Sequence, residues 1–419
     1  MSEQVPVYIK EVALVDFKGF RGEHKFSFVD DKGEWCRWTV FLGNNNTGKT
    51  NLLKAIASLE PHANKDSQDN ETIYYALGHR KDLFDNESLL GINFLPERSE
   101  ITEHDSVFNS FFKGLRCNLI YNNSMALGNS YDEYKYSNID GYGVIRIVEK
   151  KGFGSEGKDI RNSDNLFDNI GLIDFEDWLF QLDYAAKNGQ EKAAQRRDIL
   201  KETLTGDIFP EINEIQFISD EELNNYIEFK TEDGWHKMSE LGYGYQATLS
   251  WMADFCKKMF DRYPNSPNPL KEPAVLLIDE IDLHLHPQWQ RGLIKSLSDI
   301  FPQTQFIVTT HSPFIIQSME NVNLYTLTRV GDHTEVKHLG NKSYIGWKIE
   351  EILSEVMGLD EKIHTDRYNE LMAQFDEALD NDDYAIGKEA YDQLMLILHP
   401  QSAERKLLDI QFTQLTPVV

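Results

Sequence analysis

Cysteine is scarce in this sequence, and long apolar runs are absent from it. The three cysteines, Cys36, Cys117 and Cys256, lie far apart, which argues against a disulfide framework or a zinc site and fits a reducing compartment. No stretch is long enough to span a bilayer, and no charged, apolar and small-residue signal opens the chain. We therefore expect a cytoplasmic protein without a membrane partner.

Basic residues are also few relative to acidic ones. The chain has 42 Lys and Arg against 69 Asp and Glu, a formal charge of −27. This charge repels phosphate backbones, so nucleic-acid contact must be confined to a local basic patch or made through a basic partner in a complex. The best candidate patch lies on a predicted helix and consists of Lys187, Lys192, Arg196, Arg197 and Lys201. We interpret it as a solvated helix face, the commoner origin of such runs.

The remaining composition is that of a globular protein. With 419 residues, 41% hydrophobic and 26% charged, the chain is long enough for a full core and more than one domain. No internal repeat and no low-complexity tract is present, and no Ser/His/Asp or Cys/His nucleophile pattern stands out.

One stretch fits the phosphate-loop pattern G-x-x-x-x-G-K-[ST] in the context that the pattern requires. Residues 38–42 are typical of a buried strand and residues 51–57 of a helix, so a glycine loop joins strand to helix. Its backbone N–H groups and the helix N-terminus can surround phosphate oxygens. We expect Lys49 to reach the β- and γ-phosphates of ATP, and the Thr50 hydroxyl to ligate Mg²⁺. The predicted nucleotide-binding residues are Asn44, Asn45, Asn46, Thr47, Gly48, Lys49, Thr50 and Asn51.

A second apolar strand, residues 273–278, ends in the carboxylates Asp279 and Glu280. Ligands bind at the carboxyl edge of parallel sheets, so this segment has the character of a Walker B strand. Asp279 is predicted to hold the Mg²⁺ shell, and Glu280 to orient or deprotonate the water that attacks the γ-phosphate. A helix cap is the alternative interpretation of the two carboxylates.

A histidine follows the next predicted strand. After a helix over residues 288–300, the strand 305–310 ends at His311, which should emerge at the same sheet edge as Glu280. There it can donate a hydrogen bond to the γ-phosphate, although a structural histidine is the alternative. His284 and His286 lack the spacing and companions of a zinc site, so we expect no metal on them.

The order of these motifs, with Leu241–Gln246 between them, resembles the ABC-class ATPases of the SMC, RecF and OLD-like group. The segment 14–21 is similar to the group's opening strand and Phe-Arg-Gly turn, which implies that Arg21 lies near the nucleotide. The resemblance implies an α/β fold: an ABC-type ATPase head with a mixed, largely parallel sheet and antiparallel N-terminal strands. It also implies that a second copy closes each site, giving a homodimer or a larger even-numbered assembly.

The signature turn departs from the group's Leu-Ser-x-Gly. The matching position is Gly242, the nearest serine is Ser239, and Gly244 follows. Backbone N–H groups of this turn at a helix N-terminus can still bind phosphate of the opposite subunit. Whether Ser239 or Gly242 faces the nucleotide stays open at this point, and a plain surface turn before the helix 247–260 is the alternative.

A closer resemblance rests on residues 175–186 and on the acidic, helical end of the chain. Both are similar to the PtuA ATPases of Septu-type and retron-associated antiphage systems. This resemblance implies an ATP-hydrolysing defence subunit that controls a separate nuclease subunit, of the HNH type, and meets nucleic acid through the complex.

The motifs divide the chain into four predicted regions. Residues 1–62 form an N-terminal ATPase lobe, 63–205 a compact α+β insertion, 206–342 a C-terminal ATPase lobe, and 343–419 a helical region. The insertion has no sustained heptads, so it is not a coiled coil, and it contains short strand-like and turn-like pieces such as residues 141–146. The apolar faces of the helical region pack among themselves, pack on the ATPase body, or dock a partner.

Two functions remain as hypotheses. The first is the antiphage ATPase, with ATP hydrolysis as its only chemistry, because no second acidic cluster follows His311 as a metal-dependent nuclease module would require. The alternative is a RecF- or SMC-like repair or recombination ATPase that clamps DNA. The acidic charge and the lack of a coiled coil favour the first, since a clamp needs a basic inner surface.

Overall fold

The computed structural model describes residues 8–58, 139–146, 148, 162–167, 171–222, 225–359 and 364–415, with the strand segments 63–64, 73–74, 89–95, 120–122 and 125–127. Much of the predicted insertion, including its polar opening at 65–71 and Cys117, lies outside these residues. The chain divides into two compact units, Met1–Trp347 and Lys348–Val419. Among the described residues, no helix combines the length and apolar character needed to cross a membrane.

The larger unit is built on a six-stranded sheet with the spatial order β16-β15-β3-β14-β13-β9. Strand β16 runs antiparallel to β15 and the other pairs are parallel. The side chains of β13 and β14 are buried along their whole length, as expected of parallel strands covered on both faces. The strands are β3 (Trp38–Gly43), β9 (Ile139–Tyr142), β13 (Ala274–Ile278), β14 (Thr304–Thr310), β15 (Val322–Val330) and β16 (His333–Lys342).

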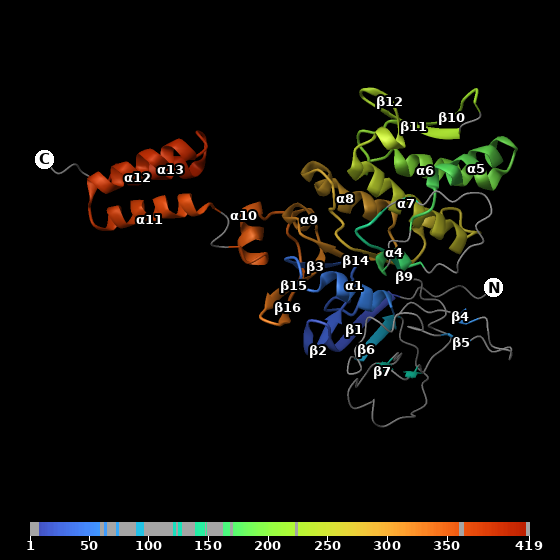
Figure 1. The fold of residues 1–419 in the computed structure, drawn as a ribbon, viewed down its shortest axis with the longest axis horizontal. Helices are drawn as coiled ribbons and strands as arrows, with labels where there is room; N and C mark the ends of the chain where they lie inside the picture. Colours follow the sequence, from blue (N-terminus) through green and yellow to red (C-terminus); the bar gives the residue numbers. More distant parts are fainter. Residues whose placement is uncertain are drawn as a thin grey trace. The chain divides into compact units, whose positions relative to one another are not determined.

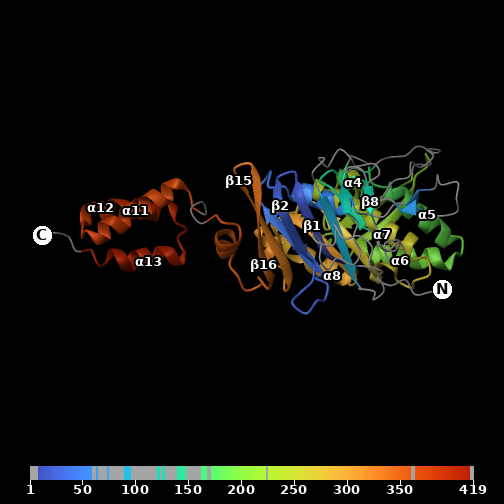
Figure 2. The same ribbon diagram turned by 90° about the horizontal axis from the view of Figure 1, so that it is seen from below.

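Two layers cover the two faces of this sheet (Figure 1). On one face lie α1 (Lys49–Ala57) and an antiparallel sheet of β2 (Phe20–Ser27), β1 (Tyr8–Phe17) and β6 (Leu89–Leu95). A single core runs between them, including Val12, Phe26, Phe41, Ile56 and Ile307. On the other face lie α7 (Tyr243–Arg262) and α8 (Pro287–Ile300). Figure 2, turned by 90° and seen from below, shows β1 and β2 with β2 beside β16.

A smaller layer packs outside α7. It consists of α5 (Phe175–Lys187), α6 (Glu191–Leu204) and the antiparallel strands β10 (Glu214–Ser219), β11 (Asn225–Thr231) and β12 (Gly234–Lys237). The remaining elements of this unit are β4 (Ala63–Asn64), β5 (Ile73–Tyr74), β7 (Ile120–Asn122), β8 (Met125–Leu127), α4 (Asp164–Phe167) and α9 (Pro313–Gln317).

The candidate basic patch is divided between α5 and α6, and most of its charges have partners within the chain. Lys187 and Arg197 both pair with the Asp183 carboxylate, at 2.6 and 3.1 Å. Arg196 donates to the carbonyl oxygen of Phe260 at 2.9 Å, and Lys201 lies over the Phe217 ring. These contacts agree with our interpretation of the run as a helix face rather than a nucleic-acid site.

Strand β9 comes from the segment that the sequence assigns to the insertion. Its four residues are fully buried and pair in parallel with β13, so part of the segment 63–205 builds the central sheet. The pattern of Ile139–Tyr142 hides this strand because Asp140 stands in its middle. The Asp140 carboxylate is compensated by the Arg262 guanidinium on α7, at 2.9 Å.

The unit Lys348–Val419 is a small helical unit with a core of its own. Its helices are α10 (Ile349–Glu351), which continues as a wider turn over Ile352–Val356, and α11 (Asp366–Asp380), α12 (Tyr384–Ile397) and α13 (Ala403–Phe412). Leu371 and Phe375 of α11 are buried against Ala390, Leu394 and Leu408 of α12 and α13. The apolar face predicted on α11 therefore packs against the neighbouring helices.

Candidate nucleotide-binding site

The phosphate loop lies between the end of β3 and the start of α1, and packing requires both of its glycines. A Cβ at Gly43 would lie 2.3 Å from the carbonyl oxygen of Leu327 on β15. Gly48 has φ 93°, a conformation that side chains rarely adopt, and a Cβ there would meet the Phe20 ring at 3.1 Å. The side chains of Asn44, Asn45 and Asn46 are exposed. The loop therefore lies at the carboxyl edge of the sheet with its asparagines exposed.

Lys49 is buried under the loop. Its ammonium group donates to the carbonyl oxygens of Gly43 and Asn44, at 2.8 and 3.0 Å. Burial lowers the pKa of Lys49, and the nearby carboxylates of Asp279, Glu280 and Asp282 oppose that shift. Lys49 therefore places a desolvated cation at the loop, where its attraction for phosphate is little screened.

The Asp279 carboxylate joins the phosphate loop to two neighbouring strands. One of its oxygens accepts a hydrogen bond from the Thr50 hydroxyl at 2.7 Å, and the other accepts from the Thr309 hydroxyl at 2.6 Å. The structure thus brings together Thr50 and Asp279, the two predicted Mg²⁺ ligands. A hydroxyl and a carboxylate are the oxygen donors that Mg²⁺ prefers. Thr309 is a site residue that sequence analysis did not select.

Glu280 is held in a strained backbone conformation at the end of β13. Its φ is 49°, and a non-glycine residue in such a conformation costs about 1–3 kcal/mol unless its surroundings impose it. The Thr309 hydroxyl accepts from the Glu280 N–H at 2.7 Å. The carboxylate itself is one third exposed, and its Oε1 lies 4.0 Å from Nε2 of His311. The two predicted catalytic residues therefore face the same space.

His311 has an uncommitted nitrogen. Its Nε2 is buried and has no hydrogen-bond partner among the residues that the structure describes. Burial lowers the pKa of His311, and the positive charge of Lys49 lowers it further, against the opposite effect of Glu280. The imidazole is therefore neutral at neutral pH, and its free nitrogen is available to a phosphate oxygen.

Buried hydrogen bonds connect the loop after Glu280 to the loop after β14. The Thr310 hydroxyl donates to the Asp282 carboxylate at 2.5 Å. The Ser312 hydroxyl donates to the side-chain oxygen of Gln290 at 2.5 Å, and the Gln290 amide donates to the carbonyl of Leu285 at 2.9 Å. The position of His311 is thus tied to that of the loop over residues 281–286.

A buried arginine supports the Walker B residues from behind. One terminal nitrogen of Arg146 donates to the carbonyl oxygens of Asp279 and Glu280, at 2.7 and 3.0 Å. Burial lowers the pKa of Arg146 to about 10 even though Asp279 and Asp282 oppose the shift. Sequence analysis missed this residue, because nothing in residues 141–146 indicates which strand they would join.

Gly242 and Gly244 have different roles at the start of α7. Gly242 precedes the helix as its N-cap, with φ −56°, which any residue can adopt. Gly244 faces the carbonyl oxygen of His284, which would lie 2.3 Å from a Cβ. Close packing therefore explains why this position is a glycine, and binding of phosphate by Gly244 stays a prediction. Ser239 is exposed in the preceding turn, and no hydrogen bond among the described residues joins these three residues to the phosphate loop of the same chain.

The two histidines of the loop over residues 281–286 have structural contacts. The His284 ring packs edge-on against Tyr243, with centroids 4.7 Å apart. A ring nitrogen of His286 accepts from the N–H of Gln288 at 3.3 Å and so caps α8. Both contacts shape the neighbourhood of the signature turn.

Arg21 lies at the surface beside the loop. Its guanidinium is 3.5 Å from the Asp332 carboxylate, and both side chains are more than half exposed. Its neighbour Phe20 packs on Gly48, so the opening turn does border the phosphate loop. That Arg21 itself contacts nucleotide stays a prediction.

The sequence is similar to an ATPase domain family and to proteins of Septu and retron systems. A family model described as an AAA ATPase domain matches residues 160–316. The Septu protein PtuA of Bacillus thuringiensis is 32% identical over 284 residues, which cover 66% of this chain and 70% of that protein. The PtuA of Bacillus mycoides is 25% identical over 74% of this chain and 39% of its own length. The retron Ec83 probable ATPase of Escherichia coli is 32% identical over 35% of this chain and 26% of its own length.

Solved structures similar to this chain include heads of SMC proteins. The SMC head domain from Thermotoga maritima is 16% identical, with a TM-score of 0.40, and the match covers 79% of this chain and 98% of that one. An Smc head bound to the C-terminal winged-helix domain of ScpA is 14% identical, with a TM-score of 0.44, and the match covers 80% of this chain and 98% of that one.

The phosphate loop, the strand that ends at Asp279 and Glu280, and His311 lie at one edge of a mixed sheet, and this arrangement defines an ABC-class ATPase. The chain binds nucleotide and hydrolyses ATP, as the matching ATPase domain and ATPase relatives support. Within this class it belongs to the PtuA family of Septu proteins.

The two glycines of the signature turn give a matched pair of substitutions. Gly244→Ala should destabilise the protein by about 1–3 kcal/mol, because the new Cβ meets a backbone carbonyl that cannot move freely. Gly242→Ser should be neutral or stabilise by roughly 0.3 kcal/mol, since serine is a good N-cap. Thermal denaturation of both variants measures the difference. Equal Tm values would contradict the packing role of Gly244.

Proposed function

We propose that this chain is the ATP-hydrolysing subunit of an antiphage defence complex, in which its nucleotide state controls a separate nuclease subunit. The observation that carries the proposal is the Thr50–Asp279–Thr309 contact, with Glu280 and His311 beside it. Membership of the PtuA family and similarity to retron ATPases support the defence role.

The residues present fit ATP with Mg²⁺. Buried Lys49, the backbone N–H groups of the loop and the N-terminus of α1 would bind the phosphates. Thr50 and Asp279 would hold Mg²⁺, whose charge offsets that of the phosphates when it is bound. The orphaned Nε2 of His311 would find an acceptor on the γ-phosphate.

Hydrolysis needs a water aligned with the γ-phosphorus. Glu280 accepts a proton from this water as its oxygen bonds to phosphorus and the bond to the bridging oxygen breaks. His311 holds the γ-phosphate in line through its free nitrogen.

The first substitutions separate binding from hydrolysis. Lys49→Ala should abolish ATP binding, because the phosphates lose a buried cation. Glu280→Gln should leave binding intact and lower kcat by about 100-fold or more, since the water loses its base. Nucleotide titration and phosphate release measure the two effects. A Glu280→Gln variant that hydrolyses ATP at the parent rate would show that the Walker B assignment is wrong.

Each site is proposed to close against a second copy of the chain. The start of α7 lies at the surface, with Tyr243 more than half exposed, and its backbone N–H groups suit a γ-phosphate of the opposite subunit through Gly242 or Ser239. Closure removes water from the phosphates, which a single head leaves open on one side.

Assembly should therefore depend on nucleotide. The Glu280→Gln variant with ATP and Mg²⁺ should form a homodimer or a larger even-numbered assembly, because unhydrolysed ATP keeps the closed state. Mass measurement in solution with and without ATP tests this, with Lys49→Ala as the control that cannot respond. A strict monomer in the presence of ATP would contradict the closure.

The alternative of a DNA-clamping repair ATPase has less support. The charge of −27 opposes general binding to DNA, and most residues of the candidate basic patch are engaged within the chain. The unit Lys348–Val419 is strongly acidic, with 16 Asp and Glu against six Lys and Arg. We propose this unit as the docking site of a basic nuclease subunit of the HNH type, through which the complex meets nucleic acid.

The purified chain alone should neither cut DNA nor bind it tightly at physiological salt, because it is acidic and carries no recognisable nuclease site. Nuclease activity should appear only after addition of the partner subunit and should change with ATP. Gel-based cleavage and partner-affinity measurements, with and without ATP, test this. Metal-dependent cleavage by the chain alone that survives Lys49→Ala would overturn the proposal.

A further inference from the structure

Among the described residues, the hydrogen bonds of Arg146 are all with backbone carbonyl oxygens, two of them in the Walker B residues. It follows β9, is only 3% exposed, and uses two of its nitrogens on backbone carbonyls. Its Nε donates to Gly143 at 3.0 Å, within its own turn. One terminal nitrogen donates to both Asp279 and Glu280, at 2.7 and 3.0 Å. The guanidinium thus joins the turn after β9 to the two Walker B residues.

The contact to Glu280 acts where the backbone is strained. With φ at 49°, Glu280 keeps its conformation only because surrounding groups hold it. Its N–H is held by Thr309 at 2.7 Å, and its carbonyl by Arg146 and by the N–H of Leu283, both at 3.0 Å. Loss of Arg146 removes the only charged group among these three anchors. The backbone of Glu280 is then held less firmly, and its carboxylate can turn away from its position in the site.

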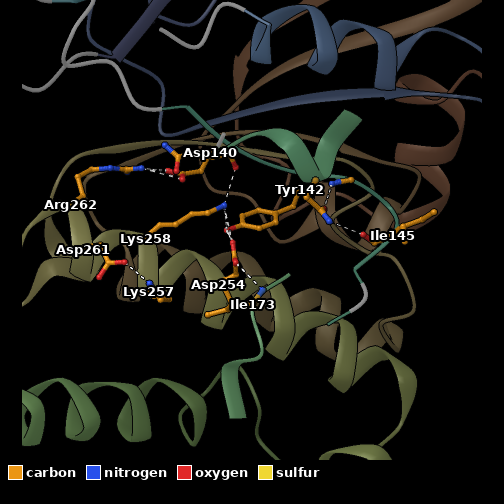
Figure 3. A network of polar contacts seen from close by, with 12 residues as sticks. Asp140, Tyr142, Ile145, Ile173, Asp254, Lys257, Lys258, Asp261 and Arg262 are labelled. Atoms are coloured by element: carbon orange, nitrogen blue, oxygen red, sulfur yellow. Dashed lines mark hydrogen bonds and ion pairs between the residues drawn. The ribbon is translucent and has the colours of Figure 1, made fainter. Parts of the chain in front are cut away.

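The arginine is itself well anchored. In Figure 3, side chains of α7 reach strand β9: Asp254 accepts from the Tyr142 hydroxyl at 2.6 Å, and Lys258 pairs with Asp254 at 2.8 Å. The carbonyl of Tyr142 accepts from the N–H of Asp279 at 2.9 Å. The side-chain oxygen of Asn165 accepts a hydrogen bond from the Gly143 N–H at 3.0 Å. Arg146 therefore acts from a fixed platform rather than from a loose turn.

Stability alone does not explain this arginine. Its second terminal nitrogen is buried without a hydrogen-bond partner among the described residues, and a buried cation with an unmet donor is costly compared with an apolar side chain. Such a cost is typical of groups retained for function.

We propose that Arg146 is a positioning residue for ATP hydrolysis, which holds the backbone of Glu280 so that its carboxylate faces the attacking water. The inference rests on the role of Glu280 proposed above. Loss of Arg146 should therefore lower kcat. Nucleotide affinity should be preserved, because the proposed phosphate ligands are the loop and Lys49, which Arg146 does not contact.

The test compares two charge-conserving substitutions on the same platform, in the full chain. Arg146→Lys shortens the side chain and removes the guanidinium whose terminal nitrogen donates to both carbonyl oxygens. Arg262→Lys is the matched control, because Arg262 pairs with Asp140 in the same strand β9 but does not contact Walker B. Single-turnover hydrolysis is measured per nucleotide-binding site, so that a fraction of misfolded protein does not enter the rate. Glu280→Gln is measured alongside.

We expect Arg146→Lys to lower the hydrolysis rate by about 10- to 100-fold, as misplacement of a catalytic group does. The ATP dissociation constant should stay within about threefold of the parent value, because the phosphate contacts are unchanged. Arg262→Lys should keep the parent rate. A parent rate for Arg146→Lys beside a slow Glu280→Gln would overturn this inference alone. Equal slowing by both arginine substitutions, or loss of ATP binding, would make Arg146 structural. A fast Glu280→Gln would overturn the underlying site assignment.

Discussion

The Asp279 carboxylate, shared between the hydroxyls of Thr50 and Thr309, is the contact on which the site depends. Thr50 belongs to the helix after β3, Asp279 follows β13, and Thr309 belongs to β14, the strand between them. One side chain therefore fixes three adjacent parts of the sheet edge at distances set by hydrogen bonds. Because Thr309 also holds the Glu280 N–H, the same contact sets where the proposed base stands.

A common electrostatic cause shapes the ionisable groups here. Burial lowers the pKa of Lys49, Arg146 and His311, and in each case the surrounding carboxylates oppose it. The pKa of His311 is lower in the folded state than in the unfolded chain, so folding favours the neutral ring. The folded protein therefore loses stability as the pH falls from the pKa of the unfolded chain towards that of the folded state. The acidic side chains of the site favour the charged forms of Lys49 and Arg146.

Continuous local patterns made much of this site predictable. The phosphate loop, the strand ending at Asp279 and Glu280, and the strand before His311 are each written in neighbouring residues, and the structure contains each element within a residue or two of its expected bounds. Strand β9 and the role of Arg146 were not predicted. A four-residue strand that contains Asp140 can be recognised only together with its distant partners, β13 and Arg262. Gly244 shows the same limit, since its constraint is the carbonyl of His284, forty residues away in sequence.

Helix α7 begins at the signature turn and ends at Arg262, where it holds strand β9. Its 20 residues form a rod about 30 Å long, buried along much of its length. A helix of this kind resists bending, so a push on its exposed tip reaches its far end as a displacement of the whole rod. One rigid helix thus joins the signature turn to strand β9 beside the Walker B strand, so a displacement of the turn would be transmitted to β9.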